Sequence, residues 1–202
     1  LDFVLMFMLL QTEPTSAGWV SSFEAEWIPR FGISLYFALD GLSLLLLLLT
    51  GFLGVVAIGS AWDEIKVQPG FFYFNLLWTL AGVVGVFTAL DLFLFFFFWE
   101  VMLIPMYFII AIWGHENKSY AAMKFFIFTQ VTGMLMLVSI LVLAYAHYTQ
   151  FGVYSFKYED LISVNVSSSL QFWVMLGFFI AFTTKLLSVP FHSWLPDAHS
   201  QA

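Results

Sequence analysis

Charged residues are scarce in this chain of 202 residues, because six basic and thirteen acidic side chains make up only 9% of it. Soluble domains carry about a quarter charged residues. Apolar residues reach 62% of the sequence. A water-soluble core of this size would be surrounded by many more charged groups, so the composition excludes an ordinary soluble domain. We expect an all-α, polytopic membrane helical bundle in contact with lipids.

Cysteine is absent from the sequence. Its absence excludes disulfides, thiolate-bound iron–sulfur clusters and cysteine-type zinc sites within these residues. The sequence also lacks the GxGxxG dinucleotide fingerprint and the GxxxxGKS/T phosphate-binding loop. A formal net charge of −7 leaves no basic face for a nucleic-acid backbone. We therefore expect no cofactor-binding residues, no metal site and no nucleic-acid partner for this chain.

Apolar runs divide the chain into predicted membrane spans, each of which needs about 20 residues. The first run, Leu1 to Leu10, has about half that length and begins without Met, so we interpret it as a helix cut in the middle. A signal peptide is the alternative, but the run lacks a basic start and a cleavage site. We predict one partial transmembrane domain over residues 1–202. Its further elements are complete spans at about 42–62, 71–90, 92–113, 123–146 and 170–189, and a half-helix over 190–202.

Polar segments separate the predicted spans. Residues 11–38 form a tryptophan-bearing stretch at the membrane surface, in which Trp27 to Arg30 and Ile33 to Phe37 indicate short extended structure. Asp40 is placed to cap the first turn of the helix that follows. One set of alternate loops is shorter and denser in basic residues, which predicts that it faces the cytoplasm. Its basic residues are Lys66, Lys118 and Lys124.

Two ionisable residues, Glu100 and Lys185, interrupt otherwise apolar spans. A central charge costs about 2.5–3.5 kcal/mol on insertion scales, so such residues usually face a protein interior or a water pathway and have a partner. Their opposite signs predict that they pair with each other. The alternatives are a protonated, merely tolerated Glu100 and a Lys185 side chain that reaches back to the membrane interface. Straight helices with a rise of 1.5 Å per residue would place Lys185 about 20 Å and Glu100 about 12 Å from the same side.

A broken last span would reduce this difference in depth, and prolines indicate where breaks occur. Pro105 and Pro190 each lie five positions after one of the two ionisable residues. Proline lacks an N–H and clashes with the carbonyl four residues earlier, so these prolines should free the carbonyls of Val101 and Leu186. Broken helices recur at ion sites in membranes, although simple packing kinks are the alternative. The sequence therefore predicts helix breaks at Pro105 and Pro190.

Further titratable side chains flank the spans, and we expect most of them to be structural. His192 and His199 are seven positions apart and would share one helix face if residues 190–202 are helical. An imidazole titrates in the range that is useful for proton transfer. We name His192, Lys124 and His199 as candidates for a proton path. A metal site is not expected, because no third ligand lies nearby.

A polytopic chain with buried charges and no nucleotide, flavin or metal motif can move ions. It cannot itself take energy from a redox reaction or from a phosphate compound, so a partner or a gradient must supply that energy. This inference names neither the ion nor the partner.

Several uninterrupted segments of the chain resemble one family of membrane proteins. The segments are Trp27 to Ser34, Asp40 to Leu44, Phe95 to Tyr107, Trp113 to His115 and His192 to Ala202. Together they resemble the antiporter-like chain M family of bacterial NADH-quinone oxidoreductase, respiratory complex I. The core of the last segment, Leu195 to His199, would also suit related chains of cation/proton antiporters.

The resemblance implies a larger, multi-pass subunit of two inverted helical repeats, bound beside sister antiporter-like subunits in the bacterial inner membrane. The family's glutamate and lysine, which pair and change proton affinity as the complex turns over, would be Glu100 and Lys185. NADH, FMN, iron–sulfur clusters and quinone would belong to partner subunits. The sequence ends at Ala202, where the family continues into a second bundle, so we expect a partial chain.

The sequence leaves three functional hypotheses open. The first is a proton-translocating membrane subunit of complex I, which couples quinone reduction elsewhere in the complex to proton movement. The second is a subunit of a multi-subunit cation/proton antiporter. The third is a non-conducting membrane scaffold, in which the buried charges only fix the register of the helices.

Overall fold

The computed structural model describes residues 19–186 and 188–201, apart from the side chains of His199 and Gln201. The predicted truncated span at 1–10 lies outside these described residues. Two strands come first, β1 (Ser21–Ile28) and β2 (Ile33–Leu39), with the 3-10 turn η1 (Pro29–Phe31) between them. The helices are α2 (Gly41–Ala61), α3 (Pro69–Thr88), α4 (Leu92–Val101), α5 (Leu103–Trp113), α6 (Lys118–Phe151), α7 (Tyr158–Ile162), α8 (Ser168–Lys185) and α9 (Trp194–Gln201), with the 3-10 turn η2 (Phe191–Ser193) before α9.

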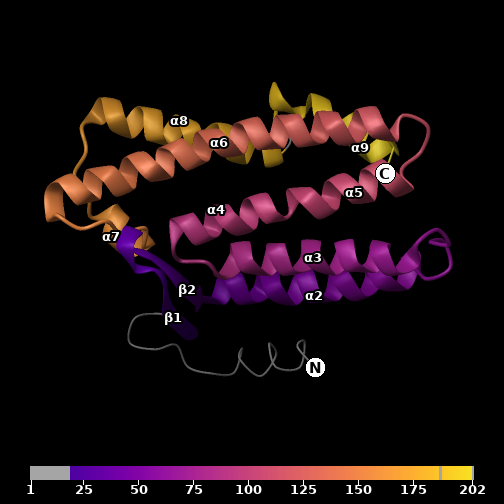
Figure 1. Ribbon diagram of the computed structural model, residues 1–202, viewed down its shortest axis with the longest axis horizontal. Coiled ribbons are helices and arrows are strands. Elements are labelled where there is room, and N and C mark those ends of the chain that lie inside the picture. The colour runs from indigo at the N-terminus through magenta and orange to yellow at the C-terminus, as the bar shows by residue number, and fades with distance from the viewer. Residues whose placement is uncertain (1–18, 187, 202) are drawn as a thin grey trace.

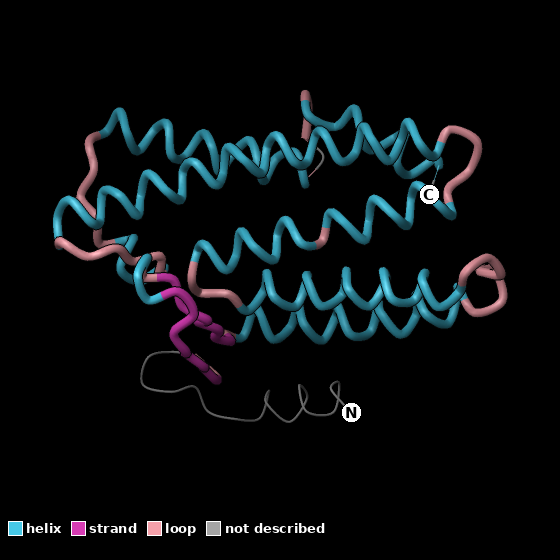
Figure 2. The backbone as a smooth tube through the Cα atoms, viewed as in Figure 1, coloured by secondary structure: helices cyan, strands magenta, loops and turns pink. Residues whose placement is uncertain are grey.

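The long helices run side by side along the longest axis of the molecule (Figure 1). Helices α2 and α3 pack together on one side, α6 and α8 lie on the other, and α4 and α5 run between them (Figure 2). Helix α6 is central, because it packs against α4, α5, α8 and α9. The strands, α7 and the α3–α4 turn gather at one end of this bundle, and the α2–α3 and α5–α6 connections lie at the other (Figure 1).

Four segments of the described chain are long and apolar enough to cross a membrane: Gly41–Ala61, Pro69–Thr88, Leu92–Trp113 and Lys118–Phe151. They overlap four of the predicted spans. The span predicted at 170–189 is represented by α8, which has 18 residues and ends at Lys185, four positions earlier than predicted. The prediction of a membrane helical bundle with a break near Pro190 is confirmed. The break is an interruption of the helix ahead of the proline, not a kink around it.

Local chemistry explains where several helices begin and end. Asp40 caps α2 as predicted, because its carboxylate accepts a hydrogen bond of 2.7 Å from the backbone N–H of Ser43. Pro69 lies in the first turn of α3, where a backbone N–H would have no acceptor within the helix, so its absence costs no hydrogen bond. Helix α6 continues past the predicted span 123–146 at both ends, and Gly152 ends it with a φ of 78°.

A β-hairpin occupies the surface stretch in which we expected short extended structure, and it is the exception to the all-α architecture. Strands β1 and β2 are antiparallel, with Phe23 opposite Phe37. Gly32, with a φ of 67°, closes the turn between the two strands. Trp27 lies 5.6 Å from the ring of Phe97 on α4, measured between ring centroids, so the hairpin packs on the helix that carries Glu100.

Asp91, which is fully buried, joins the hairpin to the start of α4. One carboxylate oxygen accepts hydrogen bonds from the backbone N–H groups of Phe93 and Leu94, at 2.9 and 3.1 Å. The other accepts from the N–H and the hydroxyl of Ser34 on β2, at 2.9 and 3.3 Å. Burial raises the pKa of Asp91, and these hydrogen bonds oppose that rise. The sequence suggested only a tight turn at this residue.

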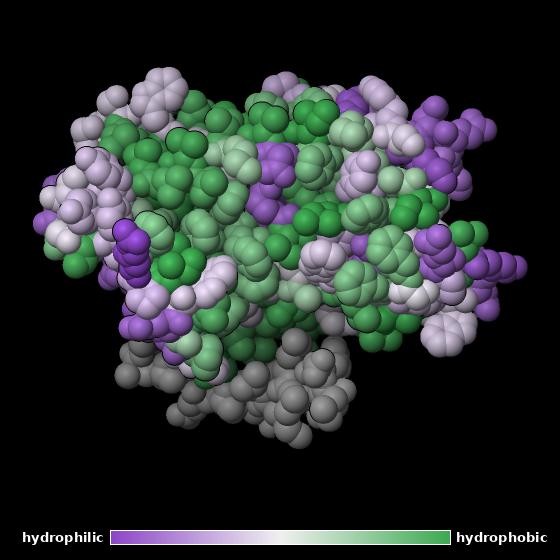
Figure 3. Space-filling model, viewed as in Figure 1, coloured by the Kyte–Doolittle hydropathy of each residue, from purple (hydrophilic) through white to green (hydrophobic). Residues whose placement is uncertain are grey.

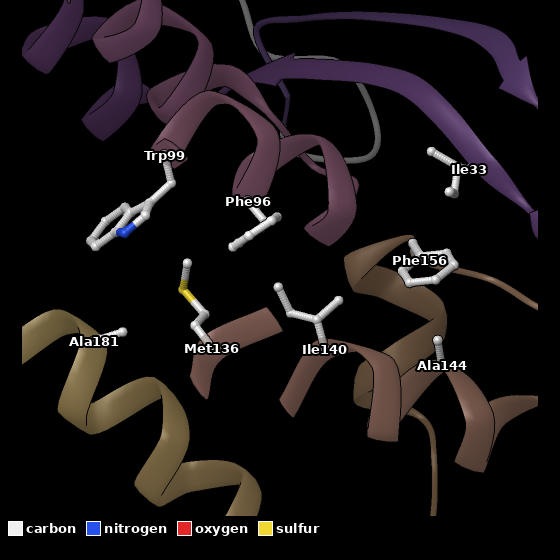
Figure 4. Packing of buried hydrophobic residues seen from close by; sticks show 8 residues of the cluster. All are labelled: Ile33, Phe96, Trp99, Met136, Ile140, Ala144, Phe156 and Ala181. Carbon is white, nitrogen blue, oxygen red and sulfur yellow. The ribbon is translucent and has the colours of Figure 1, made fainter. Parts of the chain in front are cut away.

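An apolar core connects α4 with α6 and α8 (Figure 4). Met136 and Ile140 of α6 have exposed fractions of 0% and lie at its centre. Phe96 and Trp99 reach it from α4, and Ala181 reaches it from α8 (Figure 4). This packing holds the two helices that carry Glu100 and Lys185 in one apolar cluster with Met136 and Ile140 of α6.

We expect Asp91→Ala to lower the stability of the full-length subunit, because three backbone N–H groups would lose their acceptor. An unsatisfied buried donor costs about 1–3 kcal/mol. Thermal melting of the assembled protein in detergent measures the effect. Asp63→Ala, at an exposed carboxylate in the α2–α3 turn, is the matched control. A melting temperature equal to that of the control would contradict the structural role of Asp91.

Candidate functional site: a glutamate and a lysine beside an interrupted helix

Glu100 lies in the last turn of α4 and faces α6. It lines a cavity of about 350 Å³ together with Gln130 and Met134 of α6. Most of the molecular face in Figure 3 is hydrophobic, but hydrophilic atoms appear near its middle, between the levels of α6 and α4. The Glu100 carboxyl group interacts with the Gln130 side chain, whereas its Oε1 atom is buried without a hydrogen-bond partner. The carboxyl group is therefore buried in the bundle with only part of its hydrogen-bonding capacity satisfied by protein groups.

Lys185 is the last residue of α8, and its ammonium group lies over an aromatic ring. The Nζ atom is 4.8 Å from the centroid of the Trp99 indole, within the range of a cation–π contact. The charge of Glu100 also acts on Lys185, although no ion pair within 4.0 Å joins these two described residues. The two residues lie on helices whose side chains touch, with the rings of Trp99 and Phe182 5.5 Å apart between centroids, and no direct ion pair joins them.

The helix ends that carry the two residues lie at similar levels in the bundle. Figures 1 and 2 show that the α4–α5 junction and the end of α8 both fall near the middle of the long axis. Helix α8 begins farther out than α4 does, so its longer run compensates for the later position of Lys185. The depth difference estimated for straight helices assumed that both helices start at the same level, whereas Figure 1 shows different starting levels.

The interruption after Lys185 leaves a carbonyl that a side chain satisfies. Ser188 donates its N–H to the carbonyl of Thr183 at 3.0 Å, so the carbonyl of Thr184 loses its ordinary helical donor. The indole N–H of Trp194 donates to that carbonyl at 3.2 Å. Trp194 is buried and packs against Phe125 of α6, with ring centroids 5.2 Å apart. The segment after the break is thereby anchored beside Lys185.

The other predicted break, at Pro105, corresponds to a division between α4 and α5. The helices meet at Met102, two positions after Glu100. Pro105 is buried and has no N–H to donate to the carbonyl of Val101. Both ionisable residues therefore lie within two positions of a helix end.

The candidates for a proton path lie in different surroundings. Lys124 forms an ion pair of 2.6 Å with Asp197, which ties α6 to α9. His192 is exposed in η2, and the side chain of His199 lies outside the described residues. The predicted half-helix over 190–202 corresponds to the 3-10 turn η2 followed by helix α9, which begins at Trp194.

Sequence reasoning missed three contacts of this site. Trp99 directly precedes Glu100, and its place in an aromatic run concealed its contact with Lys185. Asp197, which pairs with Lys124, and Trp194, which donates to Thr184, lie in the segment His192 to Ala202, where the sequence indicated only the family. Across the described residues, no group of three or more histidine or acidic side chains is arranged to hold a metal ion.

The fold and the site together define a class, a multi-pass helical membrane protein with an ionisable pair beside an interrupted helix. The family model described as "NADH:quinone oxidoreductase/Mrp antiporter, TM" matches residues 89–202. The chain belongs to this family, so the resemblance inferred from the sequence is confirmed. The family and its bacterial members also confirm a multi-pass protein of the bacterial inner membrane.

Named relatives agree with this assignment. The chain is 56% identical over 189 residues to NADH-quinone oxidoreductase subunit M of Escherichia coli strain K12, covering 91% of this chain and 37% of the relative. It is 52% identical over 201 residues to the subunit M of Pseudomonas aeruginosa PAO1, covering 95% and 40%. The chain thus spans about two fifths of the length of the relatives that it matches.

Solved structures show the same fold. A chain of respiratory complex I from Thermus thermophilus aligns with a TM-score of 0.83 and 33% identity, over 99% of this chain and 40% of its own length. A chain of the Mrp complex from Dietzia aligns with a TM-score of 0.78 but only 19% identity, over 99% of this chain and 22% of its own length. The second likeness shows the fold alone.

We expect Trp194→Phe to loosen the interrupted segment, because phenylalanine keeps the ring but removes the donor to the carbonyl of Thr184. A buried carbonyl left unpaired costs about 1–3 kcal/mol. Hydrogen–deuterium exchange over residues 183–194 of the full-length subunit should become faster. Trp173→Phe, at an exposed ring of α8, serves as the control. Unchanged exchange in Trp194→Phe would show that the indole does not anchor the break.

Proposed function

We propose that the chain is part of a proton-translocating membrane subunit of a bacterial NADH-quinone oxidoreductase. The observation that carries this proposal is the placement of Glu100 and Lys185 at interrupted helix ends, with Lys185 over the ring of Trp99, the residue directly before Glu100. Family membership and identity of 52–56% to relatives named subunit M support the choice of complex. NADH, FMN, iron–sulfur clusters and quinone would be bound by partner subunits, and sister antiporter-like subunits would lie alongside.

The proposed mechanism is electrostatic. An ionised Glu100 stabilises the protonated form of Lys185, since an opposite charge nearby favours the charged state of each group. Movement of Glu100 away from Lys185 would weaken the hold of Lys185 on its proton and release the proton onward. Each tenfold change in proton affinity corresponds to about 1.4 kcal/mol, which falls within the coupling range of 1–3 kcal/mol that is typical of allosteric switches.

The separation of the two side chains supports a switch rather than a permanent ion pair. Lys185 has the face of Trp99 as a neutral neighbour, with its Nζ atom 4.8 Å from the ring centroid. A cation–π contact is worth about 0.5–2 kcal/mol, enough to accommodate the ammonium while the carboxylate is elsewhere. His192, in the turn beyond the break, and bound water are the proposed next carriers of the proton.

An antiporter subunit is the second hypothesis, and the family description includes Mrp antiporters. The Mrp structure is 19% identical to this chain, so it supports the shared fold without favouring that activity. A passive scaffold is the third hypothesis. It predicts that a neutral side chain at position 100 leaves ion movement intact.

The test uses inverted membrane vesicles in which the full-length subunit of the assembled complex carries Glu100→Gln. Glutamine keeps the shape and removes the charge, so we expect NADH-driven proton pumping to be lost while assembly is retained. Glu64→Gln, at an exposed carboxylate near the end of α2, controls for the loss of a negative charge. Pumping at the wild-type rate would refute the switch and favour the scaffold hypothesis.

A further inference from the structure

Gly133 of α6 lies directly against the carboxyl group of Glu100. A Cβ atom at this position would overlap Oε1 and would lie 3.2 Å from Cδ and 3.8 Å from Oε2 of Glu100. Real Cβ contacts are rarely shorter than 3.4 Å. The carboxyl group therefore occupies a space that exists only because residue 133 has no side chain.

One oxygen of the Glu100 carboxyl group makes no hydrogen bond in this space. Oε1 is buried without a hydrogen-bond partner, whereas most buried polar atoms in proteins have one. Because no hydrogen bond reaches Oε1, its position depends on packing against α6 and on the contact that Gln130 makes with the same carboxyl group. Gln130 precedes Gly133 by three positions, on the same side of α6, and interacts with the same carboxyl group.

Other close-packed glycines of the bundle meet groups that do not carry charge. A Cβ on Gly82 would overlap the side chain of Met102, and one on Gly177 would overlap the hydroxyl of Ser139. Those two glycines permit helices to approach each other. Gly133 differs because its missing side chain is replaced by an ionisable group from a neighbouring helix.

We propose that Gly133 is a positioning residue for Glu100. The backbone of Gly133, which has no side chain, and the Gln130 side chain form a depression on the surface of α6, here called the seat. This seat fixes how closely the Glu100 carboxyl group approaches the α6 backbone. The seat thereby determines how far the carboxylate lies from Lys185. This inference rests on the proposed function, because positioning affects proton movement only if Glu100 takes part in it.

The main test introduces Gly133→Ala into the full-length subunit of the assembled complex. The added methyl group excludes the carboxyl group from its seat. We expect NADH-driven proton pumping to fall on the order of 10- to 100-fold, as for other displacements of a reacting group by about 1 Å. Gly59→Ala on α2, where a Cβ meets nothing within 4 Å, is the matched control and should pump normally.

A second variant separates positioning from simple damage to packing. Aspartate is one methylene shorter than glutamate, so Glu100→Asp combined with Gly133→Ala restores room for the carboxyl group. We expect this double variant to pump more than Gly133→Ala alone. If Gly133→Ala prevents assembly, recovery of assembly in the double variant supports the seat, and failure to recover contradicts it.

A third measurement does not depend on pumping. A lipid-soluble carbodiimide should label Glu100 faster in Gly133→Ala than in the wild type, because the displaced carboxyl group enters the cavity that it lines. Mass spectrometry of the labelled peptide gives the rate. Wild-type pumping together with wild-type labelling in Gly133→Ala would overturn the inference. Normal pumping in Glu100→Gln would instead overturn the proposed function, whereas the labelling rate would still report the seat.

Discussion

The free energy of placing an ionisable side chain in an apolar bundle is the constraint on which the rest of this arrangement depends. A central charge costs about 2.5–3.5 kcal/mol even on insertion scales. The structure offsets this cost for Glu100 and Lys185 with a side-chain amide, the face of an indole and the mutual attraction of the charges. None of these contacts is a direct ion pair, so the compensation is incomplete. Incomplete compensation leaves both groups responsive to small movements of α4 and α8.

The helix interruptions also reduce the free-energy cost of placing ionisable groups in the apolar bundle. Ending α8 at Lys185 places the ammonium group at a helix C-terminus, where the macrodipole favours positive charge. The carbonyl exposed by the break receives the indole N–H of Trp194, which prevents the break from leaving an unpaired polar group in an apolar region. The ion pair between Lys124 and Asp197 then holds α9 on α6, so the segment after the break has a defined place. The opposite end of the bundle is fixed by Asp91 and the hairpin that it anchors.

The class of fold could be predicted from the amino-acid sequence, and Glu100 and Lys185 could be singled out, because both inferences depend on local composition alone. Apolar runs of sufficient length identify the spans, and charges are so rare within them that Glu100 and Lys185 stand out. The relative depth of the pair could not be predicted, because it depends on where each helix starts in the membrane. The contact between Lys185 and Trp99 was equally inaccessible, since one tryptophan in an aromatic run has no local feature that marks it. Pro190 indicated a break, but the end of α8 at Lys185 depends on tertiary contacts of the segment that follows.

The central claim is that Glu100 and Lys185 act as one unit, and a double-mutant cycle tests it most directly. NADH-driven proton pumping would be measured in vesicles whose full-length subunit carries Glu100→Gln, Lys185→Met or both substitutions. Residues that act as a unit are strongly non-additive, so we expect the double variant to lose no more pumping than the more damaged single variant. Losses that multiply in the double variant would contradict the account, because they would show that the two residues act independently.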